Sequence, residues 1–180
     1  WMLDHWDHKQ PSYPTVKLSA DGFSVRSDQS GVYTTVLASY PLFAGTKYYF
    51  EVTLITGGEI RLGWCNLRAH FGAGRNQALG SDGNSLALDG FNRCVWTAGR
   101  RNPLLWSSWF RDSGSGSWEA GDVVGIELDL GENVKSFRFT VNGSWIQVAS
   151  RRILDGAAAD CLPLFVAVTL APHQQCYLNF

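Results

Sequence analysis

The chain has 180 residues, of which 45% are hydrophobic and 17% charged, and its formal net charge is −1. This length suits one domain, and the composition is that of a globular chain rather than a disordered one. The near-neutral charge provides no overall field that would draw the chain to nucleic acid or to a membrane. No apolar run approaches the ~18 residues of a membrane span, and no signal peptide is visible. The first residue is Trp1 rather than methionine, which indicates a segment of a longer protein.

Period-two alternation of apolar and polar residues recurs along the chain, and helical periodicity is almost absent. We expect strands in the runs 48–56, 59–65, 122–130, 136–141, 162–170 and 176–180. The run 162–170 is apolar on both faces, which favours a central strand. Asn142-Gly143 between two such runs predicts a type I′ hairpin, and only 150–159 could hold a helical turn. Many short strands without helices predict one all-β domain, an antiparallel β-sandwich.

The four cysteines, Cys65, Cys94, Cys161 and Cys176, are widely spaced and form no CxxC pair. Cys65 and Cys176 lie inside apolar strand patterns, as buried free thiols do. We therefore expect reduced thiols and an intracellular, cytoplasmic protein. A disulfide pair in a secreted protein is the alternative.

Catalytic and metal-binding patterns are weak. His5 and His8 flank Asp7 near the start of the sequence, but zinc-ligand spacing, a phosphate loop and a dinucleotide fingerprint are absent. Acidic residues concentrate between 112 and 132, which raises the question of calcium. However, Glu127 and Asp129 alternate with core residues as the polar face of a strand would, and EF-hand spacing is missing. The sequence therefore predicts no enzyme, no metal and no cofactor.

Seven segments in order resemble the SPRY domain: YYFEV, EIRLGWC, LGSDGNSLALDGF, SWEAGDVVGIELDL, SFRFTVNG, LPLFVAVTL and CYLNF. The resemblance runs from Tyr48 to Phe180 and is less clear over 16–40. It implies a bent, jelly-roll-like sandwich of two antiparallel sheets, without catalysis, whose variable loops at one end bind a peptide or protein. LGSDGNSLALDGF is similar to ryanodine-receptor SPRY domains, and the ending is similar to those of large ubiquitin ligases. We expect one domain over 1–180, with the core motifs in 48–180 and the first strands in 1–47.

Four aromatic residues of these motifs are expected in the core, namely Trp64, Trp118, Phe137 and Phe139. Gly63 precedes the first of them and would allow close approach of backbone beside a large ring. Trp118 precedes a turn and would cover the end of the sandwich, and Asp122 would order that turn. Mutations here should lower stability without selective loss of binding.

The resemblance places ligand contacts in the loop after the GW strand, in the loop after the DG turn, and near the N-terminal strands. In the first loop an aromatic of the family, often tyrosine, helps to hold the peptide. That position falls near Arg75 here, with Phe71 the nearest aromatic. The second loop replaces a short link with TAGRRNPLLWSSWFRDSGSGS, of which LLWSSWF would place Trp106 and Trp109 on opposite faces of a strand. Either the insertion buries its own aromatics, or at least one of them is an exposed anchor.

Arginine is concentrated around these loops. The segment 60–111 contains seven arginines and two acidic residues, which gives a local charge of +5. Arginine favours bidentate and stacked contacts, although several of these could simply pair with the acids of 112–132. The candidate partner-binding residues are Phe71, Arg75, Asn92, Arg93, Arg100, Arg101, Trp106 and Trp109.

Together these features predict a site for an acidic or phosphorylated peptide with a hydrophobic anchor, in a protein-interaction module. Substrate recognition in a ubiquitin ligase is one such role. A structural brace inside a large channel or ligase is the first alternative. RNA binding is the second, because arginines beside aromatics stack bases, although the near-neutral total charge argues against it.

Overall fold

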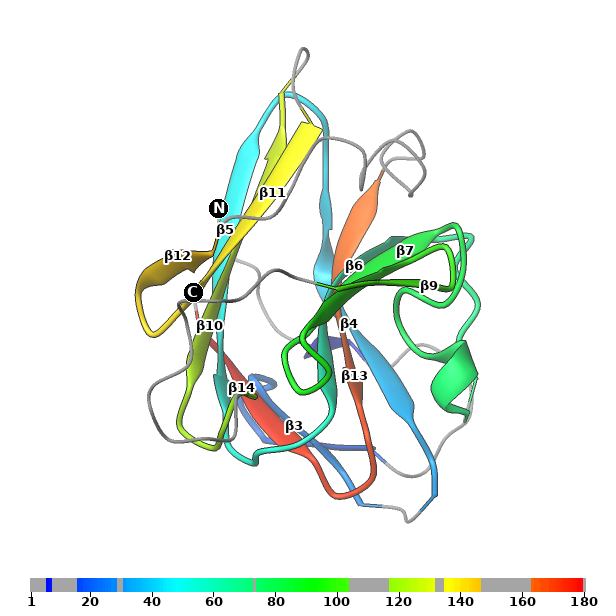
Figure 1. Cartoon of the computed structure of the whole chain (residues 1–180), viewed down its shortest axis with the longest axis vertical. Coiled ribbons are helices and arrows are strands. Elements are labelled where there is room, and N and C mark those ends of the chain that lie inside the picture. Colours follow the sequence, from blue (N-terminus) through cyan, green and yellow to red (C-terminus); the bar gives the residue numbers. More distant parts are fainter. Residues whose placement is uncertain are drawn as a thin grey trace.

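The computed structural model of the chain describes residues 6–7, 16–28, 31–72, 74–103, 117–131, 135–146 and 163–179. Within them the strands form two antiparallel sheets of seven strands each, which stack as two layers (Figure 1). The prediction of an antiparallel β-sandwich is therefore confirmed. The expected helical turn at 150–159 lies outside the described residues.

The first sheet, called sheet A, has the strand order β1-β4-β13-β6-β7-β8-β9. Its strands, in that order, are β1 (Trp6–Asp7), β4 (Thr34–Leu42), β13 (Leu164–Leu170), β6 (Ile60–Asn66), β7 (Ser85–Asp89), β8 (Cys94–Thr97) and β9 (Arg100–Pro103). β13 pairs with both β4 and β6. Val166 and Val168 lie in the core between the sheets and Ala167 lies in an apolar cluster on the opposite face, which explains why the sequence of β13 is apolar on both faces.

The second sheet, called sheet B, has the order β12-β11-β10-β5-β14-β3-β2. Its strands, in that order, are β12 (Ser144–Ile146), β11 (Lys135–Val141), β10 (Val123–Leu130), β5 (Lys47–Leu54), β14 (Gln175–Asn179), β3 (Ser24–Ser27) and β2 (Val16–Leu18). One short 3₁₀ helix, η1 (Arg75–Gln77), lies in the connection between β6 and β7. The strands expected from period-two alternation match β5, β6, β10, β11, β13 and β14 within a few residues at each end.

The main core lies between the two sheets and contains all four of the expected aromatics. Trp64 and Trp118 are 1% exposed, Phe137 is 7% exposed and Phe139 is fully buried. The Trp64 ring of sheet A meets the Phe137 ring of sheet B edge to face, with centroids 5.1 Å apart. Such a contact adds to the burial of two large apolar side chains, so this pair joins the layers at their centre.

The glycine and turn predictions are confirmed where the structure describes them. A Cβ atom at Gly63 would lie 2.0 Å from the Leu86 carbonyl oxygen, so only glycine allows β6 and β7 to pair here. Asn142 and Gly143 have φ angles of 51° and 77°, the two positive values of a type I′ hairpin, and they join β11 to β12.

The acidic residues just before β10 and on its exposed face have structural partners, as expected. Asp122 accepts a hydrogen bond from the Glu119 amide at 2.7 Å and so orders the turn that enters β10. Glu127 pairs with Arg138 at 2.6 Å on the exposed face of sheet B. No group of three or more metal-ligating side chains occurs in the described ranges, which leave out His5 and His8.

The cysteines that the structure describes, Cys65, Cys94 and Cys176, are free and buried. This agrees with the expected reduced thiols. The fourth, Cys161, lies outside the described residues.

Replacing Gly90 with alanine should destabilise the domain. The new Cβ would lie 2.2 Å from the Trp118 ring, which also donates its indole N–H to the Gly58 carbonyl at 3.1 Å and is therefore fixed. Overpacking of this kind costs about 1–3 kcal/mol in free energy of unfolding. Urea denaturation should show this loss for Gly90→Ala. The matched variant Gly83→Ala, whose Cβ would meet nothing within 4 Å, should stay within ~0.5 kcal/mol of the parent. Equal urea midpoints for the two variants would contradict the close packing of Gly90 against the Trp118 ring.

Candidate functional site

The outer face of sheet A, which points away from sheet B, is covered by the connection between β6 and β7. A second apolar cluster lies there, formed by residues that alternate along their strands with those of the main core, such as Cys65 and Ala87. Leu79 of the connection is fully buried in this cluster. In Figure 1 η1, drawn in green, lies on this outer side of sheet A. Polar side chains on this face of β6 and β7 are therefore removed from water.

Arg61 is the central charge of this covered face. Its side chain extends from β6 and is 2% exposed. Its Nη2 atom lies 3.1 Å from Glu59 Oε1, and its Nε atom lies 3.5 Å from Asp89 Oδ2. Nη1 donates to the Leu79 carbonyl at 3.3 Å. A buried charge needs such partners, because an unpaired one is expensive to remove from water.

Asp89, at the end of β7, is fully buried and organises the neighbouring turn and strand. Its Oδ1 atom accepts the backbone N–H of Asn92 at 2.9 Å, and Oδ2 accepts the Asn92 amide at 2.8 Å. Oδ2 also accepts the indole N–H of Trp96 at 2.9 Å. The Trp96 ring is thereby held over Arg61, with the guanidinium carbon 4.3 Å from the ring centroid.

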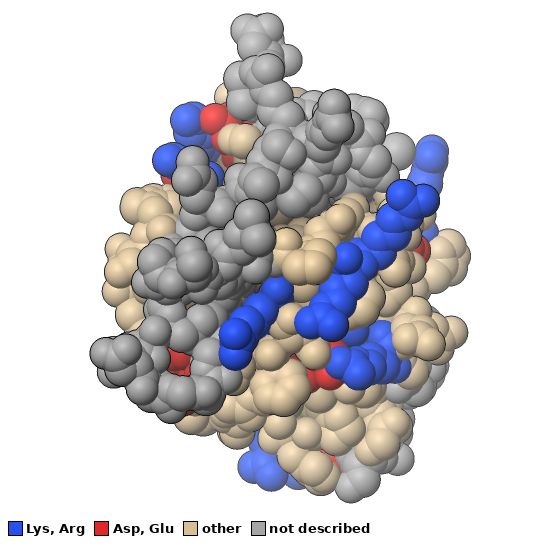
Figure 2. Space-filling view, in the orientation of Figure 1, with Lys and Arg blue, Asp and Glu red and all other residues tan. Residues whose placement is uncertain are grey.

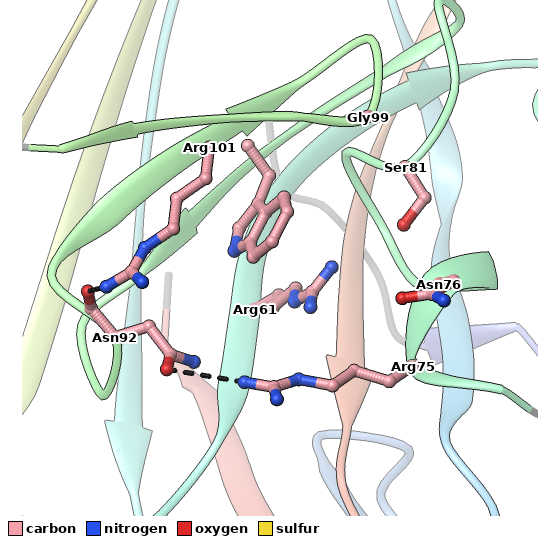
Figure 3. A pocket seen from close by; sticks show the side chains of 8 residues that line it. Arg61, Arg75, Asn76, Ser81, Asn92, Gly99 and Arg101 are labelled. Atoms are coloured by element: carbon pink, nitrogen blue, oxygen red, sulfur yellow. Dashed lines mark hydrogen bonds between the residues drawn. The ribbon is translucent and has the colours of Figure 1, made fainter.

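A pocket of about 350 Å³ opens above this network (Figure 3). It is lined by Arg61, Arg75, Asn76, Ser81, Asn92, Trp96, Gly99 and Arg101. In Figure 3 Arg101 and Asn92 stand on one side, Asn76 and Ser81 stand opposite, and Arg75 reaches towards Asn92. Three guanidinium groups thus converge from β6, η1 and β9.

Two hydrogen-bonded arginines shape the rim of this pocket. Arg75 Nε lies 3.0 Å from Glu59 Oε1, and its Nη2 donates to Asn92 Oδ1 at 3.3 Å. Arg101 Nη2 donates to the Asn92 carbonyl at 2.6 Å. Both guanidinium groups keep further N–H donors, since each arginine carries five. The pocket is therefore lined by groups that can donate hydrogen bonds.

The structure brings together three of the eight candidate residues, Arg75, Asn92 and Arg101, in one pocket. Phe71 is half-buried against the second apolar cluster and does not line the pocket. Arg93 is exposed in the turn between β7 and β8. Trp106 and Trp109 lie outside the described residues.

Arg100 and Arg101, neighbours in the sequence, face opposite sides of β9. Arg101 pairs with Trp96 across the ladder, and Arg100 pairs with Thr97. Side chains alternate along a strand, so only Arg101 shares the face of the pocket. The turn before them has positive φ at Ala98 (49°) and Gly99 (71°), as in a type I′ hairpin.

Sequence reasoning missed five pocket residues: Arg61, Asn76, Ser81, Trp96 and Gly99. Arg61 carried a usable signal, because it shares one face of β6 with Gly63 and Cys65, and these two residue types are typical of a covered face. For Asn76 and Ser81 no comparable signal exists in a polar loop.

Two arginines of the basic segment do not pair with the acids of 112–132 that the structure describes. Arg61 and Arg75 instead pair with Glu59, and Arg61 also faces Asp89. Glu59 lies directly before the segment 60–111 whose local charge is +5. The local charge of +5 therefore overstates the charge at the pocket.

Comparison with known proteins identifies the fold family. The family model of the SPRY domain matches residues 47–180. This chain belongs to the SPRY domain family. SPRY domains are protein-interaction modules and not catalytic domains.

The SPRY domain is also similar to one curated plant protein, the E3 ubiquitin-protein ligase RKP of Arabidopsis thaliana. The two are 31% identical over 135 residues, which cover 74% of this chain and 9% of the relative. The chain thus spans only a small part of that ligase. In the part of the SPRY chain that the structure describes, no helix is long and apolar enough to cross a membrane.

Proposed function

We propose that this SPRY domain binds an acidic or phosphorylated peptide in the arginine-lined pocket on the outer face of sheet A. The observation that carries the proposal is Arg101, which lines the pocket and donates to a backbone carbonyl. Among the described residues this arginine makes no ion pair, which supports its role as a contact for an anionic ligand. Figure 2 shows basic side chains in a band over the part of the surface where Figure 1 has β7, β9 and η1.

The proposed ligand site is narrower than the loop surface expected from the sequence. Ligand contacts come from η1, from the turn between β7 and β8, and from the β8–β9 hairpin, rather than from loop tips alone. Phe91, beside Asn92 in that turn, is 47% exposed and is a nearby apolar surface for a hydrophobic anchor. Trp106 and Trp109 follow β9 closely in the sequence, and we retain them as proposed anchors.

The relation to a ubiquitin ligase supports a finer proposal, that the peptide belongs to a protein to be ubiquitinated. On this view the SPRY domain recognises the substrate, and another part of a longer chain carries the ligase activity. The three buried free thiols support a cytoplasmic location, where such thiols remain reduced.

A peptide-display selection on the 180-residue chain tests the proposal. We expect acidic peptides with a hydrophobic residue to be enriched on the parent protein. Enrichment should fall on the double variant Trp106→Ala/Trp109→Ala and on Arg101→Gln, with melting temperatures checked for each. Selection of no peptide by the parent would contradict the proposal and favour a structural brace. Binding to oligonucleotides that weakens steeply with salt would favour RNA instead.

A further inference from the structure

The two carboxylates at the floor of the pocket, those of Glu59 and Asp89, already have partners within the protein. Glu59 Oε1 receives Arg61 and Arg75, and Glu59 Oε2 receives the Tyr33 hydroxyl at 3.0 Å. Asp89 accepts three hydrogen bonds and faces Arg61 Nε. Both carboxylates are thus fully engaged within the protein.

The charges of the three lining arginines are therefore only partly offset by the two carboxylates at the floor. Arg61 and Arg75 are offset by Glu59 and Asp89, which lie within 3.5 Å of one or other guanidinium group. Arg101 is the remaining cation, and in the described ranges it has no acidic partner. Counted over the described residues, the pocket and its floor thus carry one positive charge that has no acidic partner.

The negative charge of one carboxylate equals this single positive charge, whereas the negative charge of a phosphate group exceeds it. A carboxylate carries a single negative charge and accepts a fork of two parallel N–H bonds from one arginine. A phosphorylated side chain carries about −1.5 to −2 at neutral pH, so it would leave surplus negative charge close to Glu59 and Asp89. Those two side chains are 9% and 0% exposed, so water screens this repulsion poorly.

The other lining groups fit a peptide around that carboxylate. The Asn76 and Ser81 side chains make no hydrogen bond to the rest of the described chain, and they stand across the pocket from Arg101 (Figure 3). An amide and a hydroxyl both donate and accept, so they suit peptide backbone groups. Trp96 adds an apolar wall for the methylene groups of an acidic side chain.

We infer that the pocket selects a single carboxylate, seated against Arg101, and discriminates against a phosphorylated residue at the same place. The inference rests on the proposed function and narrows its ligand to one chemistry. That carboxylate belongs either to an Asp or Glu side chain or to the C-terminus of a chain.

Four synthetic peptide libraries, whose degenerate flanks exclude Asp and Glu, test this inference on the 180-residue protein. Three are C-terminally amidated and fix one central residue as Glu, phosphoserine or Gln. The fourth fixes Gln and leaves the C-terminus free. We expect a carboxylate library, either Glu or free C-terminus, to be retained about tenfold more than amidated Gln, the usual scale of a charge-assisted hydrogen bond. Which of the two is retained identifies the source of the carboxylate.

Variants at β9 control for non-specific attraction. Arg101→Gln should reduce the preference for the carboxylate library over amidated Gln to near unity, whereas Arg100→Gln should keep it. Stronger retention of phosphoserine than of Glu and the free C-terminus would overturn the inference and leave the proposed binding of an acidic or phosphorylated peptide standing. Equal retention of all libraries would overturn the inference and also the anionic character of the proposed ligand. Retention of none would overturn the proposed function and the inference together.

Discussion

Replacement of Asp89 with alanine is expected to lower the free energy of unfolding by about 3–5 kcal/mol, the usual cost of breaking a buried ion pair from one side. Asp89 is fully buried and faces Arg61, which is also buried. The variant would also remove the acceptor of the Trp96 indole and of two Asn92 donors. A small domain has only about 5–15 kcal/mol to lose, so we expect much lower yield or a much lower midpoint in urea.

The control for this prediction is Asp129→Ala on sheet B. Asp129 pairs at 2.9 Å with Lys47, whose side chain is 67% exposed, and water weakens such a pair. Its loss should therefore cost less than about 1 kcal/mol. If the Asp89 and Asp129 variants had the same urea midpoint, the buried network would not be the structural support that its geometry indicates.

Alkaline pH is expected to destabilise the domain through its buried thiols. Burial raises the pKa of Cys65 from 9.0 to about 12 and that of Cys94 to about 11, and it also raises the pKa of Cys176. Above pH 9 the unfolded chain releases these protons while the folded chain keeps them, so the unfolded state binds fewer protons and stability falls as pH rises. At pH 10.5 each thiol should contribute a loss of roughly 2 kcal/mol. Below pH 9 this loss should vanish.

Urea unfolding of the parent and of Cys176→Ala at several pH values between 8 and 10.5 checks this prediction. The absolute stability of the variant will differ because of its smaller side chain. The informative quantity is the loss between pH 8 and pH 10.5, which should be smaller in the variant by roughly 2 kcal/mol. Identical pH dependence in the two proteins would show that Cys176 does not titrate differently on folding.

The sandwich was predictable from sequence because side-chain alternation is local. β10 is readable from DVVGIELDL alone, since Val124, Ile126 and Leu128 fall on one face. The hairpin at Asn142-Gly143 is likewise set by two adjacent residues. These features need no knowledge of distant partners.

The pocket was only partly predictable because its residues meet only through contacts between segments that are distant in the sequence. Glu59 meets Arg75 only after the β6–β7 connection folds back over sheet A. Composition suggested one basic patch, but strand alternation separates Arg100 from Arg101, and Glu59 offsets part of the charge. Sequence indicated that arginine matters here, and the fold decides which arginine is available.

The most direct test of the account compares Arg101→Glu with Arg100→Glu for binding of one acidic peptide, taken from the display selection, by isothermal titration calorimetry. The two variants change the net charge equally and lie side by side on β9, but only Arg101 lines the pocket. We expect Arg101→Glu to weaken binding at least about 100-fold, since it replaces a charge-assisted contact with like-charge repulsion. Arg100→Glu should change affinity less than about threefold, the effect of a charge outside the site. Equal losses in both variants would mean that general electrostatic attraction, and not the pocket, holds the peptide.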